Sequence, residues 1–249
     1  MSILNLSSKG LTDIPKIPNN VIELDLSYNQ ITEIKPNSFP SGLKELTLSC
    51  NQLTEIHPNS FPHELKILNL CLNKIVTLHP KCFPTGLEQL YLHENKINKL
   101  VHNCFQNELK ILTLNNNYIS ELIPNCFHSG LKILDLRGNL ITTELTQCYF
   151  PVTLTELNLC NNKIKVLCKE SFPPNLSILL LTDNDIKTLS DRCFPPNLTE
   201  LHLDYNKIVQ LPEFLIDLIY LKKFSLAGKP IIDVHPSVKK WFSEMNRGK

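Results

Sequence analysis

This sequence of 249 residues is short of alanine, of glycine and of an excess of either charge. It contains one alanine, Ala227, and because alanine is the best helix former, this scarcity argues against a helical bundle. The 25 basic and 24 acidic side chains nearly cancel, which removes the electrostatic case for general binding to nucleic acid or to an anionic membrane. With seven glycines, the chain has no glycine-rich loop of the kind that cradles phosphates.

Export and membrane signals are missing as well. No apolar run approaches the roughly 18 residues that a membrane span needs. The opening MSILNLSSKG has no charged segment followed by an apolar one, so no signal peptide is expected. No Cys-x-x-Cys pair occurs, which disfavours a zinc site. The nine cysteines are therefore expected to be free thiols in a reducing, cytoplasmic compartment, and the sequence predicts no cofactor and no metal.

Leucine is in excess, with 44 residues, and it recurs with a fixed period. Copies of the pattern LxxLxLxxNxI begin at Val21, Leu43, Leu65, Leu87, Leu109, Leu131, Leu154, Leu176, Leu198 and, in a weaker form, Leu221. A degenerate copy, MSILNLSSKGL, opens the chain. The sequence therefore predicts a single repeat domain over residues 1–249, with about eleven copies of 22–23 residues.

The full unit, LxxLxLxxNxIxxLxPxSFPxx, resembles the leucine-rich repeat family. The resemblance implies an α/β-type solenoid with a parallel sheet on its concave face. The near-identical FPxxL copies also resemble leucine-rich repeat proteins of large amoeba-infecting DNA viruses, which implies a place in the host cell.

Each column of the repeat has a physical role. The segment LxxLxL alternates as a strand does, and neighbouring copies must bury its leucines because one copy is too short to do so alone. An inward asparagine side chain can satisfy the buried backbone of the following turn. The predicted ladder is Asn29, Asn51, Asn73, Asn95, Asn117, Asn139, Asn162, Asn184 and Asn206. A structural role is favoured over ligand binding for all nine.

The return segments carry a column of phenylalanine, from Phe39 to Phe194, usually followed by proline. Because proline disfavours helix at the residue before it, extended or 3₁₀ returns are expected on the convex side. The two ends need caps. Residues 1–20 are predicted to be an N-terminal capping repeat, and residues 234–249 a C-terminal cap helix with a stripe of Val238, Trp241, Phe242 and Met245. The alternative for this helix is a partner-binding segment.

Catalysis has little support in the sequence. Cys71 and His93 share an outward column of adjacent strands, so a Cys–His enzyme is geometrically possible. No third residue to orient the histidine is evident, and a shallow sheet excludes little water. The sequence therefore predicts no catalytic residue, and the enzyme is kept as an alternative. A row of lysines at strand entry favours a mixed-charge rim, with a polyanion site as its alternative. An extracellular protein is a further alternative, with glycosylation sequons at Asn5, Asn175 and Asn197.

The outward positions of the concave sheet vary while the frame does not, as in a recognition scaffold. Tyrosine and arginine are enriched at interface hot spots, and outward apolar residues need a cover or a partner. The candidate partner-binding residues are Tyr91, His93, Ile111, Ile133, Asp135, Arg137, Ile178, Leu180 and His202. The predicted function is non-catalytic recognition of a protein partner by a monomer. The alternative is an adaptor or regulatory subunit of a separate phosphatase or ubiquitin ligase.

Overall fold

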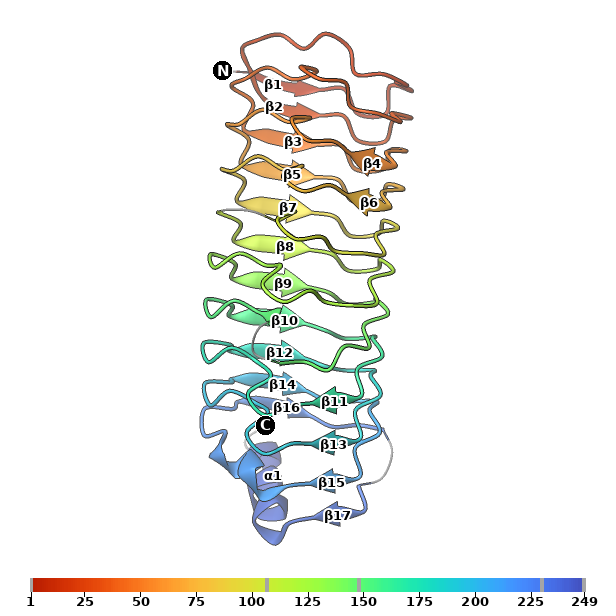
Figure 1. The fold of residues 1–249 in the computed structure, drawn as a ribbon. Helices are drawn as coiled ribbons and strands as arrows, with labels where there is room; N and C mark the ends of the chain where they lie inside the picture. The colour runs from red at the N-terminus through yellow and green to blue at the C-terminus, as the bar shows by residue number, and fades with distance from the viewer. Residues whose placement is uncertain (1, 106–107, 147–148, 229–230, 248–249) are drawn as a thin grey trace.

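The computed structural model describes residues 2–105, 108–146, 149–228 and 231–247, with only the backbone described for 245–247. Its main feature is an eleven-stranded parallel sheet in which each strand pairs with that of the next copy (Figure 1). The strands are β1 (Ser2–Asn5), β2 (Val21–Asp25), β3 (Glu45–Thr47), β5 (Ile67–Asn69), β7 (Gln89–Tyr91), β8 (Ile111–Thr113), β9 (Ile133–Asp135), β10 (Glu156–Asn158), β12 (Ile178–Leu180), β14 (Glu200–His202) and β16 (Lys223–Ser225). The predicted solenoid is confirmed.

Equivalent positions pair from strand to strand, so the inward side chains form straight columns. Leu46 pairs with Leu68, and Leu68 pairs with Leu90. These leucines are at most 1% exposed, because copies before and after each strand cover it. The core is therefore continuous along the whole solenoid rather than a sum of separate clusters.

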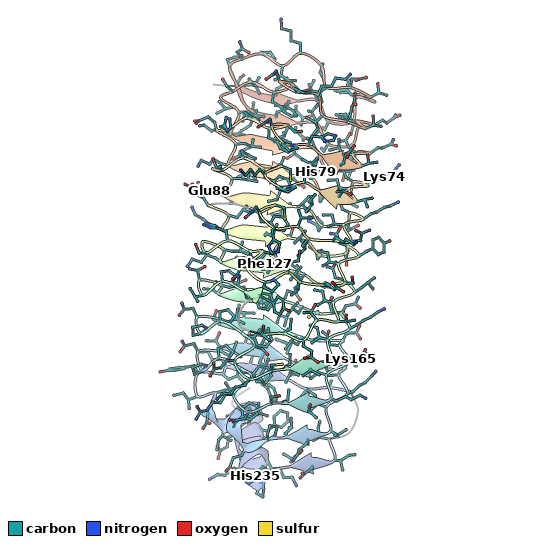
Figure 2. All side chains as sticks on the ribbon, in the orientation of Figure 1. Lys74, His79, Glu88, Phe127, Lys165 and His235 are labelled. Atoms are coloured by element: carbon teal, nitrogen blue, oxygen red, sulfur yellow. The ribbon has the colours of Figure 1, made fainter. Side chains whose placement is uncertain are left out.

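The phenylalanine column forms a second spine in the core. The rings of Phe39, Phe61, Phe83, Phe105, Phe127, Phe150, Phe172 and Phe194 are stacked in sequence, with centroids 6.0–6.4 Å apart. Phe127, in the middle of this spine, is labelled in Figure 2. Offset stacking at this spacing is favourable beyond the area buried.

The return segments are extended, as expected. Three pairs of two-residue strands run along them: β4 (Glu55–Ile56) with β6 (Thr77–Leu78), β11 (Val166–Leu167) with β13 (Thr188–Leu189), and β15 (Gln210–Leu211) with β17 (Asp233–Val234). The 3₁₀ helix η2 (Glu213–Asp217) replaces the Phe-Pro return in the penultimate copy. These short pairs tie neighbouring returns together, and Figure 1 shows them beside the main sheet, to the right of its strands.

The α-helix α1 (Pro236–Arg247) covers the C-terminal end of the solenoid (Figure 1). Val238 is fully buried, and the rings of Trp241 and Phe242 lie 5.5 and 5.7 Å from that of Phe224. The side chain of Met245, the fourth member of the predicted stripe, lies outside the described residues. Within the described ranges, no helix has the length and apolar character to cross a membrane.

Candidate functional site

The ladder asparagines connect each copy to the one before it. All nine are 4–8% exposed. In Asn117, Oδ1 accepts a hydrogen bond from the Ile97 N–H at 2.9 Å. Its Nδ2 donates to the Leu92 and Leu114 carbonyls, each at 3.0 Å. Because the partners belong to two successive copies, the side chain closes its own turn and also joins the copies.

The outward residues of the main sheet form two columns of register partners. The first column contains Gln89, Ile111, Ile133, Glu156, Ile178 and Glu200, and the second contains Tyr91, Thr113, Asp135, Asn158, Leu180 and His202. These twelve side chains are half-buried. A third column, just beyond the strands, includes His93 and the exposed Arg137. The predicted residues therefore lie on one face of one sheet.

Within that face the predicted residues are spread out rather than gathered into a pocket. Ile111 and Ile133 are direct register partners. Ile178 and Leu180 lie on β12, separated from β9 by β10. Five strand-to-strand steps separate Tyr91 from His202, about 24 Å at the usual spacing. A surface of this length suits a macromolecule better than a small ligand.

Two polar candidates toward the N-terminal end already have partners in the sheet. The Tyr91 hydroxyl donates to Gln89 Oε1 at 2.7 Å. His93 Nδ1 lies 3.1 Å from Thr113 Oγ1. Their polar atoms are therefore oriented before any partner arrives, which lowers the entropy cost of binding through the rings.

Asp135 contacts the backbone of Arg137, two residues later in the chain. Asp135 Oδ1 accepts a hydrogen bond from the Arg137 backbone N–H at 2.9 Å. Asn69 and Asn158 make the same turn with the backbone two residues later. Burial raises the pKa of the Asp135 carboxyl. The aspartate therefore shapes the strand exit, and the Arg137 guanidinium stays exposed.

His202 belongs to a polar network that the sequence did not reveal. Its Nε2 lies 2.8 Å from Glu200 Oε1, and its Nδ1 lies 2.7 Å from Ser225 Oγ. The Ser225 hydroxyl also donates to Asp204. The Lys223 ammonium, 2.8 Å from Glu200 Oε2, holds the pKa of that carboxyl below its usual range. The polar side chains of this cross-strand network therefore find hydrogen-bond and ion-pair partners in one another.

Three of the lysines at strand entry, Lys44, Lys66 and Lys110, are paired with acids. Lys110 Nζ lies 2.5 Å from Glu88 Oε2, and Lys66 Nζ lies 3.5 Å from Glu88 Oε1. Lys44 pairs in the same way with Glu64. These pairs at the surface contribute little to stability, but they neutralise the charge of these three lysines, which disfavours a polyanion site there.

The sequons at Asn175 and Asn197 are used for contacts between copies. The Asn175 amide donates to the Val152 carbonyl at 2.9 Å, and the Asn197 amide donates to the Pro174 carbonyl at 3.0 Å. A glycan on either nitrogen would replace one of its hydrogens. The structure therefore gives both asparagines a role that does not require glycosylation.

Cys71 is poorly suited to act as a nucleophile. Although it lies in an outward column, it is 6% exposed, and burial raises the pKa of its thiol. A catalytic cysteine needs the opposite shift, because the thiolate is the reactive form. His93, its proposed base, is engaged with Thr113. These observations disfavour the Cys–His enzyme.

Thiol reactivity tests this conclusion. On timed alkylation at pH 7.5, the partly exposed Cys168 should react before Cys71, and Cys82 and Cys193 should react last. Burial raises the pKa of Cys82 and of Cys193 to about 12, so both hold little thiolate at this pH. Mass spectrometry of the peptides measures the order, and protein unfolded in urea is the control, where all should react alike. Preferential alkylation of Cys71 in the folded protein would revive the enzyme alternative.

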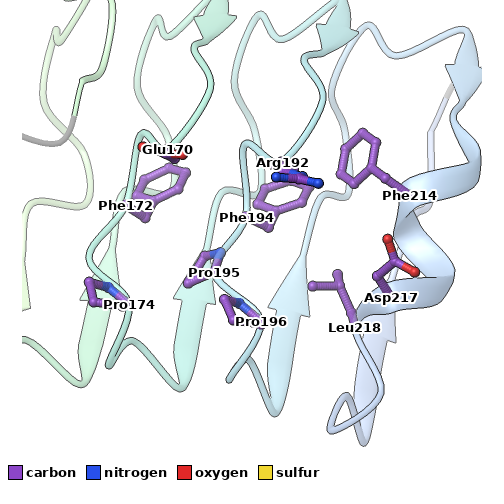
Figure 3. Close-up of a pocket in the computed structure, with 10 residues that line it drawn as sticks. All are labelled: Glu170, Phe172, Pro174, Arg192, Phe194, Pro195, Pro196, Phe214, Asp217 and Leu218. Carbon is purple, nitrogen blue, oxygen red and sulfur yellow. The ribbon is translucent and has the colours of Figure 1, made fainter.

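A hollow of about 480 Å³ lies between the last regular returns and η2 (Figure 3). Its walls include Phe172, Phe194 and Phe214 with Pro195, and Arg192 lies beside it. The sequence did not predict it, because it arises where η2 departs from the repeat. Its apolar walls belong to the phenylalanine spine and the prolines of the returns.

Comparisons with known sequences and structures identify the same repeat fold. The leucine rich repeat family models match residues 19–64, 41–97, 152–208 and 108–129, which together are more than half of the chain. Among solved structures, the crystal structure of a TLR13–ssRNA13 complex has 29% identity and a TM-score of 0.73, over 84% of this chain and 33% of that one. YopM from Yersinia enterocolitica WA-314 has 25% identity and a TM-score of 0.72, over 91% of this chain and 48% of that one.

A third neighbour shares the fold alone. The Toll–Spatzle complex from Drosophila has 23% identity and a TM-score of 0.77, over 94% of this chain and 36% of that one. This chain thus spans between a third and a half of these three proteins. No curated protein sequence matches it, so the resemblance to viral repeat proteins stays a prediction.

Proposed function

Because this chain belongs to the leucine-rich repeat family, we propose that it binds a protein partner through the outward face of its eleven-stranded sheet. Leucine-rich repeats commonly mediate recognition of proteins or other ligands, and they are typically not enzymes. The finer proposal rests on one observation: half-buried side chains of varied chemistry stand in register on a rigid frame.

The apolar and aromatic members of this face supply the binding energy. Ile111 and Ile133 form a continuous apolar strip with the Tyr91 ring near one end. Ile178 and Leu180 form a second apolar patch on β12. Burying such partly exposed groups against a partner removes apolar surface from water, at about 25 cal/mol per Å². The exposed Arg137 stands beyond β9 and supplies a charged contact.

A protein fits this face better than a nucleic acid. TLR13 is in complex with the single-stranded RNA ssRNA13 in its crystal structure, which raises RNA as a second candidate. However, the outward columns include Asp135, Glu156 and Glu200, which would repel phosphates. The net charge of +1 provides no compensating surplus. We therefore favour a protein, recognised without catalysis by a monomeric chain in a reducing compartment, where free cysteines such as Cys50 are stable.

Replacing Tyr91, Arg137 and Leu180 together by alanine should weaken binding of the partner by at least about 100-fold, because two contacts of hot-spot type and one apolar contact would be lost. The partner is first identified by affinity capture and mass spectrometry, and the affinity is then measured with both purified proteins. If the partner is a phosphatase or a ubiquitin ligase, the adaptor alternative is selected. A single-stranded RNA tested in parallel should not bind at physiological salt.

The matched control replaces His102, Val166 and Lys169 by alanine. These exposed residues also provide a ring, an aliphatic group and a cation, but they lie on the return segments. The control should bind the partner normally, and both triple variants should melt within a few degrees of the parent. Loss of binding in the control alone would move the interface to the return side.

A further inference from the structure

We propose that Glu55, His57 and His79 form a binding site for a divalent transition-metal ion, with Zn²⁺ as its natural occupant. The site lies on the return segments and is separate from the proposed recognition face. Its ligands come from two successive copies of the repeat, so that a bound ion would tie those copies together. The sequence pattern that disfavoured zinc concerned cysteine pairs alone, and it therefore does not bear on this site.

The short strands β4 and β6 bring the three side chains together. Glu55 pairs with Thr77, and Ile56 pairs with Leu78. His57 and His79 follow these pairs immediately and occupy the same position in successive copies (His79 is labelled in Figure 2). Their rings are stacked, with centroids 5.5 Å apart and planes inclined by 19°. Glu55 and His57, two residues apart on an extended segment, project to the same side.

The ligand atoms are spaced as a metal site requires. Glu55 Oε1 lies 3.3 Å from His57 Nε2, and Glu55 Oε2 lies 3.5 Å from His79 Nε2. All three side chains offer ligand atoms within 4.8 Å of one another. Two ligands at ordinary zinc distances in a tetrahedral site are about 3.4 Å apart. One or other oxygen of the carboxylate therefore already lies at about this distance from each imidazole nitrogen.

His79 provides a second observation that points to a ligand at this site. Its Nε2 is buried and has no hydrogen-bond partner, even though Glu55 Oε2 is 3.5 Å away. A buried nitrogen without a partner is costly, and such an atom calls for an explanation. Coordination of an ion between His79 and Glu55 would satisfy it.

A lysine of the preceding copy does not oppose the binding of a cation. The nearest equivalent residue in the preceding copy, Lys35, is already paired with Asp13 at 2.7 Å and Glu33 at 3.5 Å. Its charge is thus largely neutralised before an ion arrives. Two imidazoles and one carboxylate suit Zn²⁺, Ni²⁺ or Cu²⁺ rather than Ca²⁺ or Mg²⁺. His57 and Glu55 are about half exposed, so their side chains can close around the ion.

Titration of the full chain with ZnCl₂ in a calorimeter tests the site. The parent chain should bind one equivalent of Zn²⁺. Its affinity for this ion should fall at least about 10-fold in His57→Gln and in Glu55→Gln. The control is His63→Gln, which removes an exposed histidine outside the cluster and should leave binding unchanged. Any Zn²⁺ bound by thiols would be the same in the parent and the three variants, so a difference in Zn²⁺ affinity between these four proteins reports on the cluster. Circular dichroism checks that the exposed substitutions leave the fold intact.

Co²⁺ provides the second measurement. Bound at this site, it should give visible d–d bands without the ultraviolet charge-transfer band of a thiolate ligand. Those bands should disappear in His57→Gln and remain in His63→Gln. Equal Zn²⁺ affinity in the parent and in both cluster variants would overturn the proposal. A cobalt spectrum dominated by thiolate and insensitive to His57 would overturn it as well.

Discussion

Replacing Asn117 by alanine should lower the free energy of unfolding by about 3 kcal/mol, because several buried backbone groups would lose their partners together. The side chain accepts from the Ile97 N–H and donates to the carbonyls of Leu92 and Leu114. Asn117 is 4% exposed, so water cannot replace it without opening the turn. Equilibrium unfolding in urea, followed by circular dichroism, measures the change.

Lys96→Ala is the matched control. Lys96 follows the ladder position of the preceding copy, and its side chain is exposed. Truncating it should change the free energy of unfolding by no more than about 0.5 kcal/mol. If Asn117→Ala and Lys96→Ala had equal unfolding midpoints, the ladder would have no structural role. A broad transition in Asn117→Ala alone would instead show that the copies on either side unfold separately.

The fold could be predicted from the sequence because its determinants repeat. A leucine such as Leu112 has the same neighbours as Leu90 and Leu134, so one copy explains all the others. The Phe-Pro return excludes a long helix wherever it occurs, and η2 appears where this pattern is absent. The period of the sequence was therefore sufficient to predict the strands, the return segments and the core.

The backbone conformation before the ladder was less predictable. The residues preceding the ladder asparagines adopt positive φ of 52–66° at Tyr28, Cys50, Leu72, Glu94, Asn116, Gly138, Asn161, Asp183 and Tyr205. Glycine, asparagine and aspartate suit this region, but Leu72 and Tyr205 do not. The sequence therefore does not predict this left-handed turn, because the fold imposes a positive φ on residues that disfavour it.

The sequence could predict which candidate residues lie on the outward face of the sheet, but it could not predict the hydrogen bonds that they make there. Alternation along the strands places Asp135 and His202 on the outward face. Their hydrogen bonds, however, depend on rotamers and on side chains of neighbouring copies, which do not repeat. The Asp135 contact with the Arg137 backbone and the His202 contact with Ser225 are of this kind. The Glu55, His57 and His79 cluster was missed for the same reason, since two copies create it and the others do not.

Removing residues 236–249 should cause the protein to aggregate, because the last repeat would lose its apolar cover. Helix α1 buries Val238 completely and packs two aromatic rings against Phe224. Without it, Phe224 and neighbouring core residues such as Leu215 would lie at an open end of the solenoid. Size-exclusion chromatography with light scattering measures the change in mass.

A point substitution tests whether aggregation follows from loss of the apolar packing of α1 or from removal of the segment itself. Val238→Asp places an unpaired charge in the buried contact, which is strongly unfavourable, and it should reproduce the aggregation with α1 still present. Lys240→Asp makes the same change on the exposed side of α1 and should leave the protein monomeric. If both the truncated chain and Val238→Asp stay monomeric with unchanged cooperativity, α1 is not a cap. Its apolar stripe would then be free to bind a partner, as in the alternative that the sequence left open.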